Sequence, residues 1–102
     1  MAKILIIDDD RQVCEMLSNI IVDMGHCVTC HQTLESGVRE AATEKYDLVL
    51  LDVGLPDGNG LDAIARIQEI MPAPQIIIFT ALGDQNGAEL AIRNGAWDYI
   101  QK

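Results

Sequence analysis

Five polar residues, far apart in the chain, each lie at or just after the carboxyl end of an apolar segment: Asp8, Asp9, Asp52, Thr80 and Lys102. If those segments are parallel strands, their carboxyl ends meet at one edge of a sheet, which is where open α/β sheets bind ligands. Carboxylates, a hydroxyl and an ammonium are together the groups that phosphoryl transfer to a carboxylate requires. The sequence therefore predicts a phosphoryl-transfer site with Asp52 as the nucleophile.

Three of these residues, Asp8, Asp9 and Asp52, would crowd their carboxylates into one crevice. Like charges that close do not all remain ionised cheaply, so either one carboxylate takes up a proton or a cation fills the crevice. Oxygen ligands favour Mg²⁺ (or Mn²⁺). We expect Asp9 to bind the metal directly and Asp8 to bind it through water, while Thr80 and Lys102 contact the phosphoryl group.

Each of these residues, taken alone, has an ordinary structural explanation. An acidic triplet such as 8–10 is most often a solvated loop or a helix N-terminus, where Asp10 favours the helix dipole. Asp52 alone is typical of a turn, Thr80 of a helix cap and Lys102 of a solvated terminus. Only their joint occurrence at strand ends favours a phosphoryl-transfer site.

The elements that must position these residues alternate between strand and helix patterns. The continuous apolar runs that predict buried strands are Ile4–Ile7, Leu48–Leu51, Ile76–Phe79 and, more weakly, Cys27–Cys30, with Trp97–Ile100 as a last strand. The predicted helices cover Arg11–Met24, Thr33 (as N-cap) to about Lys45, a stretch after the turn at 56–60, and about Gln85–Asn94. The residues expected to face inward are Val13, Met16, Leu17, Ile20, Ile21 and Met24 in the first helix, Leu34, Val38, Ala41 and Ala42 in the second, and Leu61, Ile64, Ile67 and Ile70 or Met71 in the third.

This alternation predicts one α/β domain over residues 1–102, with a flavodoxin-like, doubly wound, five-stranded parallel sheet in the order 2-1-3-4-5. In that order the first and third strands are neighbours, which brings Asp8 and Asp9 beside Asp52. The first and fifth helices would cover one face, and we expect no fifth helix within this chain, so the domain would be truncated at its carboxyl end. An uncovered apolar face of that kind predicts self-association, or a stability lower than that of a chain extended by one helix.

The composition excludes several classes of partner. A net charge of −9 over 102 residues repels phosphate backbones and anionic lipid, so we expect no direct nucleic-acid or membrane binding. The apolar runs are far shorter than a membrane span, and we expect a cytoplasmic protein.

Three cysteines, Cys14, Cys27 and Cys30, are expected to be free thiols. The segment Cys27–His31 has the spacing of a c-type haem attachment site, but it also has a strand pattern, in which residues three apart point to opposite faces. We therefore predict a strand that carries small thiols, without haem or zinc.

Four segments, 4–10, 50–60, 79–81 and 95–102, closely resemble response-regulator receiver domains of two-component signalling, and the resemblance covers the whole chain. It implies that Asp8 and Asp9 are the acidic pair, that Asp52 is the phosphoacceptor, and that the backbone carbonyl of Gly54 is a further metal ligand. It further implies phosphate contacts from Ala81 and Lys102, a hydroxyl switch at Thr80, and an aromatic switch at Tyr99.

The resemblance also implies partners. The donor would be a sensor histidine kinase, and the segment 95–102 is similar to that of receivers fused to ATPase activators of transcription, which suggests a C-terminal output domain outside this chain. Such a domain is a phosphoacceptor and not a turnover enzyme. Two rivals remain: a haloacid-dehalogenase-like Mg²⁺ phosphatase, and a metal-free pseudo-receiver that acts only as an interaction module.

Overall fold

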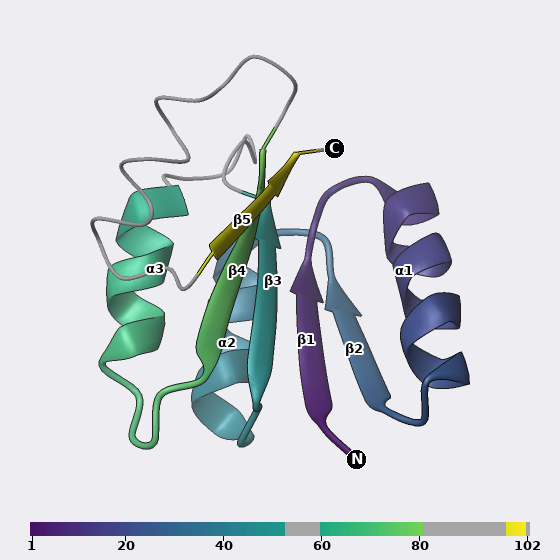
Figure 1. The fold of residues 1–102 in the computed structure, drawn as a ribbon. Coiled ribbons are helices and arrows are strands. Elements are labelled where there is room, and N and C mark those ends of the chain that lie inside the picture. Colours follow the sequence, from purple (N-terminus) through teal and green to yellow (C-terminus); the bar gives the residue numbers. More distant parts are fainter. Residues whose placement is uncertain (53–59, 81–97, 102) are drawn as a thin grey trace.

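The computed structural model describes residues 1–52, 60–80 and 98–101, and within them a parallel sheet is flanked by helices on both faces (Figure 1). The elements in chain order are β1 (Lys3–Ile7), α1 (Arg11–Asp23), β2 (Cys27–His31), α2 (Leu34–Thr43), β3 (Leu48–Asp52), α3 (Gly60–Gln68), β4 (Gln75–Thr80) and β5 (Asp98–Gln101). The predicted helix at Gln85–Asn94 lies outside the described residues.

The strand order is β2-β1-β3-β4-β5, and every neighbouring pair is parallel. The doubly wound α/β class and the strand order predicted from the sequence are confirmed. The last strand is described from Asp98 to Gln101, and its predicted first residue, Trp97, lies outside the described residues. The weakest predicted strand, at Cys27–Cys30, is present as the edge strand β2.

Capping residues set the ends of the first two helices. Asp10 is the N-cap of α1, where its carboxylate accepts from the backbone N–H groups of Gln12 (2.9 Å) and Val13 (3.4 Å). Gly25 follows the helix with a φ of 92°, the left-handed conformation that ends many helices and that glycine adopts without a steric penalty. Thr33 caps α2 as predicted, accepting from Ser36 N at 3.2 Å.

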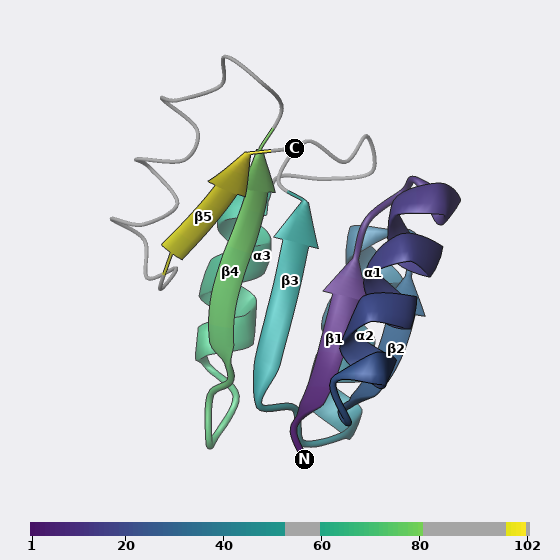
Figure 2. The ribbon, with the colours of Figure 1, turned by 45° about the vertical axis from the view of Figure 1, so that its right-hand side comes forward.

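Two hydrophobic cores lie on opposite faces of the sheet, because successive strand residues alternate between faces. Alternate residues Leu5 and Ile7 of β1 pack with α2 and α3, whereas Ile4 and Ile6 pack with α1. Figures 1 and 2 show α1 on one side of the sheet and α2 and α3 on the other. This is the layer arrangement expected for the three described helices.

Several residues predicted to face inward are exposed. In α1 Cys14 and Ile21 are buried against the sheet and Leu17 packs beside them as predicted, while Met16, Ile20 and Met24 are 56%, 51% and 66% exposed. The sequence pattern predicted the apolar stripe of α1 but not which part of it meets the sheet. No helix among the described residues covers β3 and β4 on the side of α1 (Figures 1 and 2), so no described helix lies beside the exposed edge of this stripe.

The inward-facing residues predicted for α2 and α3 need smaller corrections. Leu34, Val38 and Ala41 are buried as predicted, but Ala42 is exposed because it follows Ala41 onto the outer side of α2. After α3, Ile70 is the residue packed against the core, and Met71 is 87% exposed.

Candidate metal centre

Strands β1 and β3 carry three carboxylates to the same edge of the sheet. Ile7 is paired with Leu51 in the parallel β1–β3 ladder, so Asp8, just after β1, and Asp52, the last residue of β3, emerge at the same level. Asp9 follows at the start of the connection to α1. The predicted convergence of these three residues is therefore present in the structure.

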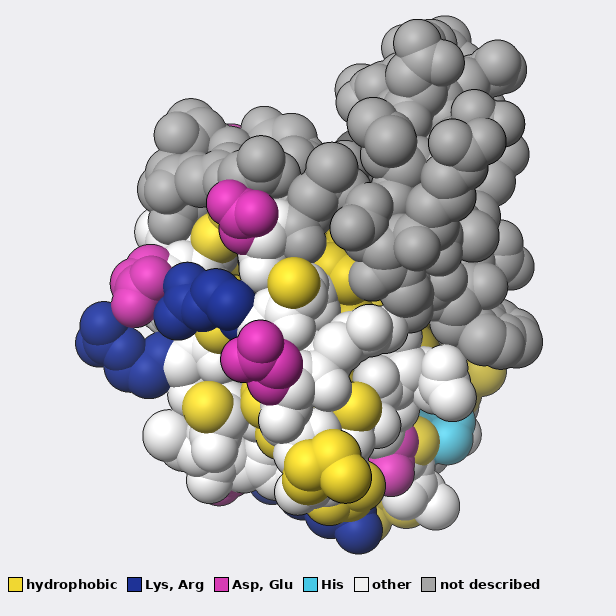
Figure 3. Space-filling view, turned by 90° about the vertical axis from the view of Figure 1, so that its left-hand side faces the viewer, with side chains coloured by type: hydrophobic (Ala, Val, Ile, Leu, Met, Phe, Trp, Pro, Cys, Tyr) yellow, Lys and Arg dark blue, Asp and Glu magenta, His cyan; other side chains and the backbone are white. Residues whose placement is uncertain are grey.

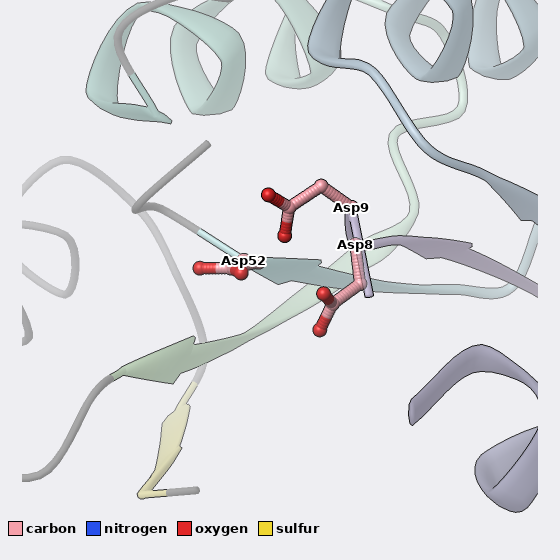
Figure 4. A group of neighbouring side chains, drawn as sticks. All are labelled: Asp8, Asp9 and Asp52. Carbon is pink, nitrogen blue, oxygen red and sulfur yellow. The ribbon is translucent and has the colours of Figure 1, made fainter. Parts of the chain in front are cut away.

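The three side chains form a compact group (Figure 4). Asp8, Asp9 and Asp52 each offer one carboxylate oxygen, and these oxygens all lie within 4.8 Å of one another. Asp8 is fully buried and Asp52 is 7% exposed, whereas Asp9 is exposed. Two carboxylates are thus held at the floor of the site and the third lies on its open side.

Backbone and side-chain hydrogen bonds fix the position of Asp8. Its N–H donates to the carbonyl oxygen of His31 at the end of β2 (3.0 Å), and its Oδ1 accepts from the N–H of Asp10 (2.9 Å). The thiol of Cys14 donates to its carbonyl oxygen at 3.6 Å. The sequence analysis missed His31 and Cys14 as supports of the site, since nothing in the spacing links either residue to Asp8. The N-cap role of Asp10 could have been predicted, because an aspartate directly precedes the helical pattern.

The donor set suits a hard divalent cation. Carboxylate oxygens are preferred ligands of Mg²⁺, which usually takes one or two carboxylates from the protein and keeps several waters or phosphate oxygens. An exposed Asp9 beside two buried carboxylates leaves the open side of the site to such ligands. A bound cation would also offset the repulsion among three neighbouring carboxylates.

The remaining predicted site residues are placed only in part. Thr80 is the last residue of β4 and is paired with Gln101 of β5, while Phe79, just before it, is paired with Asp52. The backbone at Thr80 thus lies at the same edge of the sheet as Asp52. Tyr99 lies in β5, paired with Ile78. Gly54, Ala81 and Lys102 lie outside the described residues.

Charged side chains of both signs lie side by side on the face that Figure 3 shows. Glu35 accepts from Arg39 at 3.3 Å and from Arg66 at 3.4 Å, which joins α2 to α3. These two ion pairs place charges of both signs together on the outer side of α2 and α3. No helix within the described residues is long and apolar enough to cross a membrane.

A doubly wound parallel sheet with a carboxylate cluster where its strand order reverses defines a class of ligand-binding α/β domain. Within that class, residues 4–102 match the family model of the response regulator receiver domain. The chain belongs to this family, whose members are signalling domains of two-component systems, many of them within transcriptional regulators. The prediction made from the sequence motifs is confirmed.

Individual relatives agree with this assignment. Over 105 residues the chain is 39% identical to the chemotaxis protein CheY of Thermotoga maritima. This alignment covers 98% of this chain and 84% of CheY. The chain is 34% identical to the KDP operon transcriptional regulatory protein KdpE of Escherichia coli and 37% identical to the DNA-binding transcriptional regulator NtrC of Azospirillum brasilense. These alignments cover 100% of this chain with KdpE and 99% with NtrC. They cover only 45% of KdpE and 21% of NtrC, so the chain spans less than half the length of either regulator.

Solved structures give the same result. NtrX from Brucella abortus aligns with a TM-score of 0.91 at 28% identity, covering 99% of this chain and 23% of NtrX. A two-component response regulator from Clostridium difficile aligns with a TM-score of 0.92 at 27% identity, covering 100% of this chain and 84% of that one.

Proposed function

We propose that this receiver domain is a phosphorylation-dependent switch in which Asp52 accepts a phosphoryl group with the help of Mg²⁺ or Mn²⁺. The observation that supports this most directly is the convergence of Asp8, Asp9 and Asp52, whose oxygens lie within 4.8 Å of one another at the carboxyl edge of the sheet. Asp9 would bind the metal directly, Asp8 through water, and Asp52 would hold the metal while its other oxygen attacks phosphorus.

The position of Asp52 between two neighbouring strands suits its role as the nucleophile. Asp52 lies at the end of a strand fixed on both sides by β1 and β4, so its carboxylate needs little reorganisation before attack. A divalent cation held by Asp8, Asp9 and Asp52 would supply positive charge that offsets the negative charge an incoming phosphoryl group meets. Gly54 would add its carbonyl oxygen to the metal, and Ala81 and Lys102 would contact the phosphoryl oxygens.

The relay of the signal would begin at Thr80. Its hydroxyl would follow the phosphoryl group, and Tyr99 on the neighbouring strand would move into the space that it leaves, biasing a two-state equilibrium. The pairing of Thr80 with Gln101 puts the backbones of the two switch segments in direct contact. Strand β5 would then be part of the output face.

The donor and the output follow from the class of protein. We propose a sensor histidine kinase as donor, because two-component systems pair such kinases with receivers. The similarity to NtrC and NtrX supports a C-terminal output domain, an ATPase transcription activator, in the complete protein. We place the reaction in the cytoplasm, because Cys14, Cys27 and Cys30 are free thiols and a reducing compartment keeps most thiols in that state.

The decisive experiment is phosphorylation by a small donor. The chain is incubated with acetyl phosphate and Mg²⁺ and analysed by intact mass for a single acid-stable, base-labile phosphoryl adduct. Asp52→Asn should abolish the adduct. Asp10→Asn is the matched control, because it makes the same chemical change in the neighbouring N-cap residue, which lies outside the cluster, and it should leave the adduct unchanged.

Three results would contradict the proposal. An adduct of unchanged stoichiometry in Asp52→Asn would move the nucleophile elsewhere. Steady release of phosphate from a small phosphoester would favour a phosphatase of the haloacid-dehalogenase type. Failure of the wild-type chain to bind Mg²⁺ would favour a pseudo-receiver.

A further inference from the structure

Cys14 and Cys30 lie together at the contact between α1 and β2. The thiol of Cys30 lies 3.8 Å from the carbonyl oxygen of Cys14, and the hydroxyl of Ser18 lies 3.3 Å from the same thiol. Cys14 belongs to the core cluster on the α1 face of the sheet, and the partly buried Cys30 packs against that cluster. The pKa of the Cys14 thiol is raised to about 12, first by burial and then by a hydrogen bond with Cys30.

The pair is accessible from solvent on one side. Cys14 is 4% exposed, but Cys30 is only partly buried, because β2 is an edge strand of the sheet. Both residues line a surface pocket of about 570 Å³ whose other walls include Arg11, Ser18 and His31. A small disulfide molecule therefore has room to reach the sulfur of Cys30, which belongs to the more exposed of the two cysteines.

We propose that Cys14 and Cys30 are a redox-active pair that forms an intramolecular disulfide with a low-molecular-weight disulfide as the oxidant. The Cys30 thiol loses its proton and its sulfur attacks one sulfur of the oxidant, which releases the first small thiolate. The Cys14 sulfur, losing its own proton, then attacks the Cys30 sulfur of the mixed disulfide and releases the second. The two protein thiols are oxidised, the oxidant is reduced to two small thiols, and the released thiolates take up the two protons.

This disulfide would act on the site at the edge of the sheet. The Cys14 thiol donates to the carbonyl oxygen of Asp8 at 3.6 Å, and the disulfide has no S–H left to donate. The new bond also ties the first turn of α1, which follows Asp8 and Asp9, to β2. Oxidation therefore weakens Mg²⁺ binding. This effect on the metal rests on the proposed function, whereas the pairing of the thiols requires neither a metal nor a phosphoryl group. A reversible disulfide in a reducing compartment is typical of redox sensing.

The chain contains its own control thiol. Cys27 is exposed, and its sulfur lies 3.6 Å from Met1 Sδ at the other end of β2. All measurements are made in a Cys27→Ser background, so that intermolecular disulfides do not confuse the result. Cys14→Ala and Cys30→Ser are then made in this background. Because Cys30→Ser keeps a hydroxyl near Ser18, it still tests the pairing if Cys14→Ala fails to fold.

The reduced protein is titrated with oxidised glutathione and analysed by intact mass and by peptide mapping without reduction. We expect a monomer that has lost two hydrogen atoms, a linked Cys14–Cys30 peptide, and a higher melting temperature that dithiothreitol reverses. Cys14→Ala should stop at a glutathione adduct on Cys30, and Cys30→Ser should give neither product. If the Cys27→Ser protein itself stops at a stable glutathione adduct, or keeps both thiols unmodified, the proposed pairing is wrong.

Mg²⁺ titration of the reduced and oxidised monomers tests the second step. The oxidised form should bind more weakly, by up to about tenfold, which is the scale of losing an outer-shell partner of a metal ligand. Equal affinities in the presence of a proven disulfide would overturn the coupling alone. No Mg²⁺ binding in either form would count against the proposed function, and the mass result would still decide the pairing.

Discussion

Ile7 and Leu51 are partners in the β1–β3 ladder, and this one register places Asp8 beside Asp52. A shift of the register by one residue would turn one of the two carboxylates away from the other, because successive strand residues face opposite sides of the sheet. The register is held by burial, since Ile7 and Leu51 are both fully buried in the core packed against α2 and α3. The hydrophobic core thus determines the geometry of the acidic site.

Removing the exposed carboxylate should separate function from stability. Asp9→Ala takes away a metal ligand, so Mg²⁺ affinity should fall at least about tenfold. It also relieves repulsion with Asp8 and Asp52, so the free energy of unfolding without metal should rise. Mg²⁺ titration followed by the fluorescence of Trp97, the single tryptophan, together with urea unfolding, measures both effects.

The matched control for Asp9→Ala is Asp10→Ala. Asp10 caps α1, so its loss should lower the free energy of unfolding by about 1 kcal/mol. Its carboxylate lies outside the cluster, so Mg²⁺ affinity should stay the same. Equal Mg²⁺ affinities in wild type and Asp9→Ala would argue against a metal ligand at Asp9.

Gly37 marks the closest approach of α2 to the sheet. A Cβ added there would lie 2.5 Å from both Cγ1 and Cδ1 of Ile7, far inside normal contact. Although alanine is the better helix former, Gly37→Ala should therefore destabilise the fold by about 1–3 kcal/mol. Urea unfolding of Gly37→Ala, Ile7→Val and the double variant tests this, because Ile7→Val removes Cδ1. The cost of Gly37→Ala should be smaller in the Ile7→Val background, and an equal cost in both backgrounds would place the strain elsewhere.

The phenol of Tyr46 should make stability depend on alkaline pH. Tyr46 is buried, and its hydroxyl donates to Glu40 Oε2 at 2.7 Å. The pKa of Tyr46 is raised to about 12, mainly by burial and next by the hydrogen bond to Glu40. The folded-state pKa lies above the unfolded value of about 10, so the contribution of the neutral phenol is fully present below pH ~10. It is lost as the pH rises through about 12.

Tyr46→Phe tests this dependence. The variant should lose about 1 kcal/mol at neutral pH with the hydrogen bond to Glu40. The pKa of Glu40, which that hydrogen bond lowers most, should rise. Between neutral and strongly alkaline pH the unfolding free energy of the variant should fall less than that of wild type. Parallel curves for the two proteins would show that the phenol is not the titrating group.

The sequence predicted most of the fold because its strands are continuous apolar runs, such as Ile4–Ile7, and its helices have clear caps, such as Thr33. It predicted the acidic cluster because chemistry and strand position agreed at Asp8 and Asp52. It did not predict how α1 is rotated about its axis. The apolar stripe of that helix is wider than the part that meets the sheet, and only packing decides that Cys14 is buried and Met16 is not. The contact between Cys14 and Cys30 depends on the same rotation.

The exposed flank of α1 leads to the last prediction. Ile20 and Met24 lie on the side of the helix away from the pocket at β2, and the sheet beyond them presents Leu48 and Ile77, which are only partly buried. An apolar hollow of about 350 Å³ is lined by Leu48 and Ile77 together with Asp47 and Gln75. Apolar surface of this kind is typical of interaction sites.

We expect the 102-residue chain to self-associate through this surface. Sedimentation over a concentration series should show a monomer–oligomer equilibrium, and Ile20→Gln should raise its Kd by about tenfold, which corresponds to roughly 1.4 kcal/mol for a half-exposed isoleucine. Val22→Gln is the matched control, because Val22 is 56% exposed against 51% for Ile20 but lies on the opposite flank of α1. It should leave the Kd unchanged. A chain that stays monomeric at every concentration, or two variants that weaken association equally, would show that this surface is not the contact.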